Sequence, residues 1–145
     1  MEAADNPVLA CRLAGAVEGM QPLMNMLRAA RDASVERFLI TSSACIYRRD
    51  SPIPTTESDG TEGSPAPTNA GYGWAKRMQE YLGAEYSREF GLPVAIARPF
   101  NAYGPRDDFR METSHVIPAL IRKVLEGDGP VEVWGSGRQS RGFLY

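Results

Sequence analysis

The sequence lacks the features that mark several specialised classes of protein. Among its 145 residues are only two cysteines, Cys11 and Cys45, which are too few and too unpatterned for a disulfide framework or a zinc site. We interpret both as free thiols in a reducing cytoplasm. The formal net charge of −2 gives no electrostatic reason to bind nucleic acid or an anionic membrane. No apolar run is long enough to cross a bilayer, and the acidic residues 1–5 do not begin a secretory signal.

What the sequence does contain is an alternation of helical and apolar extended segments. The spacing of apolar residues and the positions of proline and glycine predict three helices and several short strands. This alternation favours an α/β fold with a parallel sheet and crossover helices. The helices are expected at 22–32, 71–90 and from 115–118 to 126, and the strands at 37–43, 93–98 and 131–134, with 143–145 inside a further strand.

A long segment, residues 48–71, separates the first predicted strand from the second predicted helix. It holds four prolines and three glycines, so we predict a surface loop. A loop of this length in a compact domain is more often functional than idle. It can serve as a specificity lid or as a plain connection.

Four side chains with complementary chemistry flank this loop. Ser43 and Cys45 follow the first predicted strand, where ligands of open α/β sheets bind, and in extended chain they point the same way. Tyr72 and Lys76 stand four residues apart at the start of a helix, so they share one face. An ammonium beside a phenol favours the phenolate, which can take a proton from a sugar hydroxyl while Ser43 donates to the same oxygen. The set predicts alcohol–ketone chemistry by hydride transfer.

Each part of this pattern also has a simpler explanation. Ser43 can merely terminate a strand, and a Tyr-x-x-x-Lys pair arises by chance in many chains. Cys45 can be an ordinary core thiol, and His115 can simply occupy the first turn of a helix. Tyr47 can face the same cleft as Ser43 and Cys45 or turn away from it. The correct order of the residues around a strand, a loop and a helix favours the catalytic interpretation.

Several different motifs are distributed along nearly the whole chain from Pro22 onward. They are the runs 42–47, 72–76, 98–105, 115–118 and 134–137, the last followed by Arg141. Together they resemble the extended short-chain dehydrogenase/reductase family, which contains nucleotide-sugar epimerases, dehydratases and reductases.

That resemblance implies an NAD or NADP cofactor, a nucleotide-sugar substrate and no metal. It makes Tyr72 the general base, Lys76 its electrostatic partner and ribose contact, and Ser43 the donor to the reacting oxygen. A guanidinium can bind a diphosphate through paired hydrogen bonds. The residues expected to hold cofactor and substrate are Pro99 against the nicotinamide, Asn101 on the sugar nucleotide and Arg141 on its diphosphate.

The runs 43–47 and 114–118 most resemble family members that epimerise GDP-sugars at C3 and C5. The resemblance then makes Cys45 and His115 an acid/base pair, and a thiol and an imidazole both titrate near neutral pH. The alternative is a UDP-sugar 4-epimerase that does not use these two side chains. The family's dehydratases carry an acidic pair at the positions of Ala44 and Cys45, so we do not expect elimination of water.

The glycine-rich turn that opens the family fold and binds the cofactor pyrophosphate has no counterpart in this sequence. We therefore expect an internal fragment with a partial Rossmann-like, doubly wound parallel sheet. Residues 1–100 would be the C-terminal half of a dinucleotide-binding domain, and 101–145 the beginning of a nucleotide-sugar-binding part. Alone, the fragment is expected to be inactive or to act as a binding module, whereas the full-length enzyme would be a homodimer.

Overall fold

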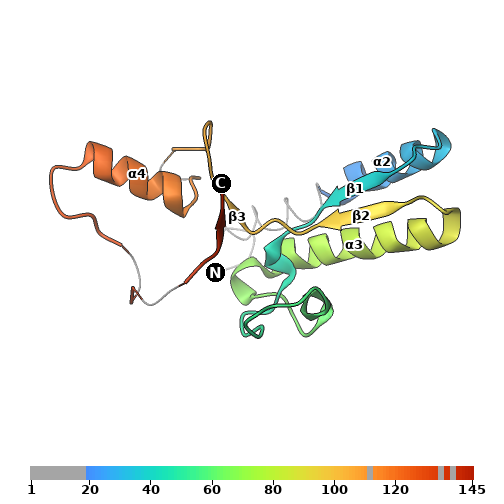
Figure 1. Ribbon diagram of the computed structural model, residues 1–145, viewed down its shortest axis with the longest axis horizontal. Helices are drawn as coiled ribbons and strands as arrows, with labels where there is room; N and C mark the ends of the chain where they lie inside the picture. Colours follow the sequence, from blue (N-terminus) through green and yellow to red (C-terminus); the bar gives the residue numbers. More distant parts are fainter. Residues whose placement is uncertain (1–18, 111–112, 134–135, 138–139) are drawn as a thin grey trace, which may run out of the picture. The chain divides into compact units, whose positions relative to one another are not determined.

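The computed structural model describes residues 19–110, 113–133, 136–137 and 140–145 (Figure 1). The chain divides into two compact units, Met1–Pro99 and Phe100–Tyr145, and each unit has its own helices and its own pair of strands. The thiol of Cys11 and the residues Trp134 and Gly135 lie outside the described part.

The first unit is built on a parallel pair of strands, β1 (Phe38–Thr41) and β2 (Val94–Ala97). Their register pairs Phe38 with Val94 and Thr41 with Ala97, and the long helix α3 (Ala70–Phe90) forms the crossover between them. Figure 1 shows α3 running along this pair of strands. An α/β crossover of this kind requires a long connection, which the loop and α3 supply. The predicted α/β class and both strands are confirmed.

Helix α2 (Met20–Asp32) supplies the rest of this unit's core. Leu27 and Ala30 are buried on its inner side and pack with Leu92, at the end of the connection from α3. Burying apolar side chains of this size stabilises the unit by about 1.5–3 kcal/mol for each large residue. The predicted helix is confirmed and begins slightly earlier than Pro22.

Glycine determines how closely α3 approaches its neighbours and where it ends. A Cβ atom on Gly83 would collide with the side chain of Ile40, which is almost fully buried in β1. Gly91 has a φ of 66°, in the left-handed region that glycine adopts without strain, and its N–H closes the helix on Ser87. The predicted stop of this helix at Gly91 is confirmed.

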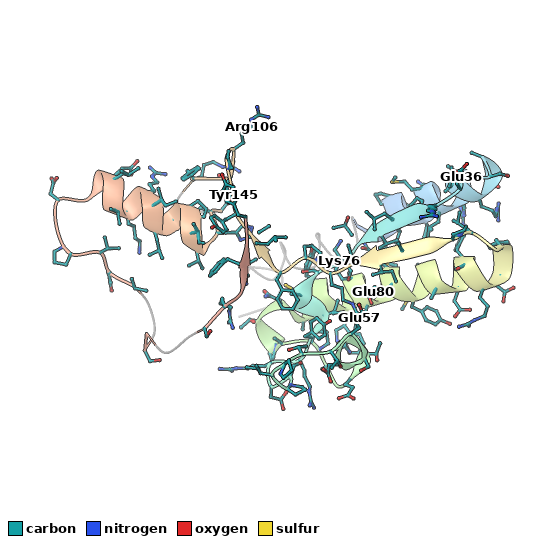
Figure 2. All side chains as sticks on the ribbon, in the orientation of Figure 1. Glu36, Glu57, Lys76, Glu80, Arg106 and Tyr145 are labelled. Carbon is teal, nitrogen blue, oxygen red and sulfur yellow. The ribbon has the colours of Figure 1, made fainter. Side chains whose placement is uncertain are left out.

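The predicted loop is irregular but firmly held. Arg77 on α3 donates to the carbonyl of Ile46 from Nε and Nη2, and to the carbonyls of Glu62 and Gly63. One guanidinium therefore ties the turn before the loop and an internal part of the loop to the helix. Figure 2 labels Glu57 on this loop and Lys76 and Glu80 on α3.

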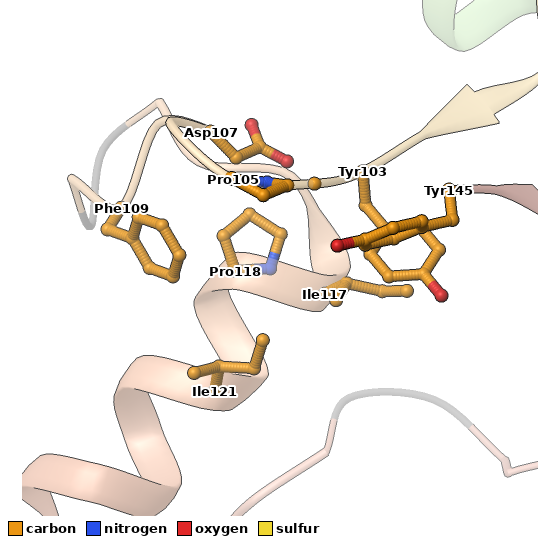
Figure 3. Close-up of a pocket in the computed structure, with 9 residues that line it drawn as sticks. Tyr103, Pro105, Asp107, Phe109, Ile117, Pro118, Ile121 and Tyr145 are labelled. Atoms are coloured by element: carbon orange, nitrogen blue, oxygen red, sulfur yellow. The ribbon is translucent and has the colours of Figure 1, made fainter.

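The second unit contains helix α4 (Val116–Glu126) and a short parallel pair, β3 (Asn101–Ala102) and β4 (Phe143–Leu144). The helix ends before Gly127, as predicted, and the extended residues near the C-terminus are confirmed as β4. A pocket of about 260 Å³ opens beside α4 and is lined largely by apolar and aromatic side chains (Figure 3). It contains none of the predicted catalytic side chains.

One predicted strand is wrong. Residues 131–133 are irregular, although Val131 and Val133 favour extended structure. Strand propensity is expressed only where a partner strand is available, and within the second unit β3 pairs with β4 instead. Among the helices of the described residues, none combines the length and apolar character needed to cross a membrane.

Candidate active site

Ser43 begins a tight turn at the carboxyl end of β1. Its backbone is extended, and its hydroxyl accepts a hydrogen bond from the N–H of Cys45 at 3.2 Å, which caps the short 3-10 helix Ala44–Ile46. The N–H of Ala44 donates to the carbonyl of Pro99 at 3.2 Å. The turn that carries Ser43 and Cys45 is therefore anchored to the end of β2, as the position of ligand sites in parallel sheets predicts.

Tyr72 and Lys76 lie on one face of the first turns of α3, as predicted. The Lys76 ammonium is 5.6 Å from the centre of the Tyr72 ring, and it donates to the carbonyl of Thr41 at 2.8 Å. The Ser43 hydroxyl lies close enough to Tyr72 to lower the pKa of its phenol. The structure thus brings Ser43, Tyr72 and Lys76 together at the end of β1.

The protonation of Tyr72 differs from the sequence-based expectation. Burial raises the pKa of Tyr72 above its ordinary value of 10.0, a negative charge on Cys45 raises it further, and the hydrogen bond from Ser43 lowers it. Burial also lowers the pKa of Lys76. Burial therefore disfavours the expected phenolate in this structure, and the Lys76 ammonium donates its hydrogen bond to the carbonyl of Thr41.

Cys45 lies on the Tyr72 side of the turn. A charge on its sulfur acts on the phenol, and the side-chain Nδ2 of Asn69 approaches the sulfur to 3.8 Å. Asn69 directly precedes α3, but its side chain makes no capping hydrogen bond. Its contact with Cys45 was therefore not predictable from the helix-start pattern alone.

Tyr47 turns away from this group. Its hydroxyl accepts from Nη1 of Arg98 at 3.0 Å, and Arg98 also binds Glu80. The possibility that Tyr47 faces the cleft is therefore wrong, because a partly buried guanidinium binds its hydroxyl. Sequence reasoning gave no role to Arg77, Arg98 or Glu80, and no local spacing connects Arg98 with the other two residues.

The remaining predicted residues belong to the second unit. Asn101 in β3 donates from Nδ2 to the carbonyl of Gly142 at 3.0 Å, so strand pairing brings it beside the residue that follows Arg141. Arg141 is exposed. His115 precedes α4, its carbonyl accepts from Ala119, and its side chain is exposed.

The residues at the end of β1 fit the ribose of a nicotinamide cofactor better than a metal. Lys76 has a single hydrogen-bond acceptor among the described residues, Thr41, so its ammonium retains donor capacity for ribose hydroxyls. Tyr72 is 39% exposed and can be reached by a ligand. Within the described ranges, no group of His, Cys, Asp and Glu side chains is arranged to hold a metal ion.

Comparison with known proteins identifies the family. Residues 17–145 match the model of the NAD dependent epimerase/dehydratase family. The chain is 38% identical over 125 residues to GDP-L-fucose synthase of Escherichia coli, covering 83% of this chain and 39% of that protein. It is 39% identical over 137 residues to GDP-L-colitose synthase of Yersinia pseudotuberculosis, covering 89% of this chain and 44% of that protein.

The solved structures agree with this match. A GDP-L-fucose synthetase from Naegleria fowleri bound to NADP superposes with a TM-score of 0.83 and 29% identity, over 92% of this chain and 45% of that one. The resemblance and the Rossmann-like fold class are confirmed, and the chain spans about two-fifths of the length of these curated relatives. The chain belongs to the NAD dependent epimerase/dehydratase family.

Proposed function

We propose that the protein acts in a nucleotide-sugar epimerase/reductase that transfers a hydride at C4 of a GDP-linked sugar. The observation that carries this proposal is the grouping of three side chains at the end of β1: the Ser43 hydroxyl acts on the Tyr72 phenol, and the Lys76 ammonium lies beside the Tyr72 ring. In this proposal the unit Met1–Pro99 supplies the side chains for hydride transfer, and Phe100–Tyr145 contributes to holding the nucleotide sugar.

The raised pKa of Tyr72 suits it to act as a proton donor when a C4 ketone is reduced. At neutral pH the phenol carries its proton, and its hydrogen bond to Ser43 orients it. Tyr72 gives that proton to the ketone oxygen while Ser43 donates a hydrogen bond to the same oxygen. The oxygen becomes a hydroxyl, and in the reverse direction Tyr72 accepts the proton.

A nicotinamide cofactor, when bound, supplies or accepts the hydride. Lys76 would hold its ribose through the remaining ammonium hydrogens, and Pro99 would lie against the nicotinamide. The N–H of Ala44 binds the carbonyl of Pro99, so Pro99 is held close to the turn that presents Ser43. The match to an NADP-bound relative supports NADP as the first cofactor to test.

Cys45 and His115 are proposed to invert C3 and C5 before the reduction. A C4 ketone makes the neighbouring C–H groups acidic, so one side chain removes a proton and the other returns one from the opposite face. The proximity of Cys45 to Tyr72 supports this role for the thiol. Asn101 and Arg141 are proposed to bind the sugar nucleotide and its diphosphate.

The hydride-transfer proposal can be tested in a chimera in which this chain replaces the segment that it matches in the Escherichia coli GDP-L-fucose synthase. GDP-L-fucose and NADP are supplied, and the formation of NADPH is followed by absorbance. Tyr72→Phe should reduce turnover by about a hundredfold or more, because it removes the acid/base hydroxyl. Tyr81→Phe, at an exposed position of the same helix, is the matched control. Equal turnover in the two variants would overturn the assignment.

The role of Cys45 has a separate readout. In deuterated buffer the chimera should exchange protons at C3 and C5 of its 4-keto sugar. Cys45→Ser should suppress this exchange, because a hydroxyl is a far weaker base than a thiolate. Undiminished exchange would remove Cys45 from the mechanism and favour the 4-epimerase alternative.

We also propose that the full-length protein forms a homodimer through α3. Trp74, Met78 and Tyr81 follow helical spacing and are 51%, 49% and 59% exposed, which makes an apolar stripe on one face of the helix. Sedimentation of the chimera should show a dimer that Met78→Glu dissociates. A monomer before substitution would contradict this proposal.

A further inference from the structure

Cys45 is fixed by contacts to its backbone and to its sulfur. Its N–H donates to Oγ of Ser43 at 3.2 Å, and a Cβ atom placed on Gly73 would lie 2.5 Å from its carbonyl oxygen. The first turn of α3 therefore packs directly against the backbone of Cys45. These contacts set where the residue stands, but they do not decide whether its sulfur carries a proton.

The contact that reaches the sulfur comes from Asn69. Its Nδ2 lies 3.8 Å from Sγ of Cys45, across 24 positions of sequence that include most of the loop. An amide N–H that points at sulfur stabilises the thiolate over the thiol, because hydrogen bonding to the charged form favours that form. Asn69 also immediately precedes α3, whose N-terminal end carries partial positive charge.

We propose that Asn69 is a positioning residue that holds the Cys45 sulfur beside Tyr72 at the start of α3. The proposal rests on the proposed function, in which Cys45 exchanges protons with the sugar. Asn69 stands three residues before Tyr72, so the same helical start carries the donor to the sulfur and the phenol that reduces the ketone. The side chains for proton exchange and for reduction of the ketone are therefore positioned by the same helix start.

This arrangement has a chemical consequence for the order of the steps. A charge on Cys45 raises the pKa of Tyr72, so the thiolate and the phenolate disfavour each other. While the sulfur is charged and ready to remove a proton, Tyr72 keeps the proton that it needs for the later reduction.

The test uses the 145-residue chain itself and does not depend on enzyme activity. Iodoacetamide reacts with thiolate, so the rate of alkylation at neutral pH measures the thiolate at Cys45. Mass spectrometry of the separate peptides quantifies Cys45 against Cys11 as an internal reference. Asn69→Asp has the same shape and is an equally good residue before a helix, but it replaces the donor by a negatively charged acceptor.

Asn69→Asp should slow the alkylation of Cys45 by about tenfold or more, since it removes a hydrogen bond to a charged group and adds repulsion. Serine is also a favourable residue before a helix, but its side chain is too short to reach the sulfur. Asn69→Ser should therefore slow the alkylation of Cys45 by a smaller factor than Asn69→Asp does. Asn25→Asp makes the same charge change on α2 and should leave the rate unchanged. Circular dichroism should show equal helix content in all three variants.

An alkylation rate in Asn69→Asp equal to that of the unsubstituted chain would overturn the proposal, because the contact with Asn69 would then have no effect on the sulfur. If Asn69→Asp disturbs the fold, the alkylation rate of Cys45 in Asn69→Ser is used instead, and a rate equal to that of the unsubstituted chain would likewise overturn the proposal. Slow alkylation of Asn69→Asp together with undiminished solvent exchange in Cys45→Ser would retain the role of Asn69 toward the sulfur. That outcome would reject only the catalytic role of Cys45.

Discussion

Arg98 binds Glu80 through two parallel hydrogen bonds, from Nε to Oε1 at 2.9 Å and from Nη2 to Oε2 at 2.7 Å. The side chains are 16% and 9% exposed, so the pair is largely removed from water. The pKa of Arg98 is raised, and the largest cause is its hydrogen bonding to Glu80. Arg98 also donates a hydrogen bond to the hydroxyl of Tyr47. This pair joins the end of β2 to α3 directly behind the turn that carries Ser43.

We predict that Glu80→Gln destabilises the chain by about 3 kcal/mol, because it leaves the guanidinium of Arg98 without its counter-charge in a poorly hydrated place. The free energy of unfolding in urea, followed by circular dichroism, measures this loss. Glu85→Gln breaks the exposed pair between Glu85 and Arg88 and should cost less than about 1 kcal/mol. Equal losses of unfolding free energy in the two variants would show that the pair of Arg98 and Glu80 contributes no more to stability than the exposed pair.

The titration of Tyr72 provides a second prediction. Its raised pKa means that the folded state binds the proton more tightly than the unfolded state. The stability that this group contributes is therefore complete below its ordinary pKa of 10.0 and is lost as the pH rises through the higher folded value.

Substitutions of its neighbours should move this titration in opposite directions. Cys45→Ala should lower the pKa of Tyr72 by removing a negative charge, whereas Ser43→Ala should raise it by removing the hydrogen bond. Phenolate absorbance, taken as the difference from a chain with Tyr72→Phe, isolates this tyrosine among the six in the sequence. Shifts of the same sign in both variants would contradict the geometry of the site.

Gly73→Ala should disturb the site through packing alone. Its new methyl group would lie 2.5 Å from the carbonyl oxygen of Cys45 and 2.6 Å from Cβ of Pro65. Relieving such a contact requires the backbone to move, which should lower the free energy of unfolding by about 1–3 kcal/mol. The melting temperature should fall, and the alkylation rate of Cys45 should change with it. Gly104→Ala, which adds a methyl group to open space, is the control, and equal behaviour of the two would contradict this packing.

Arg77 should determine how tightly the loop is held. Its guanidinium binds the carbonyls of Ile46, Glu62 and Gly63 at once, which a lysine ammonium cannot reproduce in the same fork. Both Arg77→Gln and Arg77→Lys should therefore speed cleavage after Glu62 by a glutamate-specific protease, by about tenfold. Arg88→Gln, farther along the same helix, should leave the cleavage rate unchanged. Unchanged cleavage in Arg77→Gln would show that the loop is held by other contacts.

The elements of the first unit were predictable because their signals are local. A glycine after a long apolar-periodic segment predicted the stop of α3, and Gly91 does have the left-handed backbone that makes such a stop. The four-residue spacing of Tyr72 and Lys76 likewise placed both on one face. Helical periodicity and turn chemistry determine these features without reference to distant residues.

The failures concern features that depend on distant partners. The pKa of Tyr72 is raised first by burial and then by a charge on Cys45, and both causes depend on how α3 packs against the turn after β1. The strand expected at 131–134 is irregular over its described residues 131–133, which have no partner strand among the described residues of the second unit. The role of Arg98 depends on Glu80, with which it shares no periodic spacing.

The parallel pairing of β1 with β2 has a consequence for how the protein is made. Phe38 must find Val94 across the entire loop and α3, so these contacts have high contact order and form slowly. During synthesis, Ser43 and Tyr72 leave the ribosome well before the strand that brings their supporting elements into register. A nascent chain that ends before β2 contains these residues but lacks the strand pairing that aligns them. This part of the site therefore forms only when β2 pairs with β1.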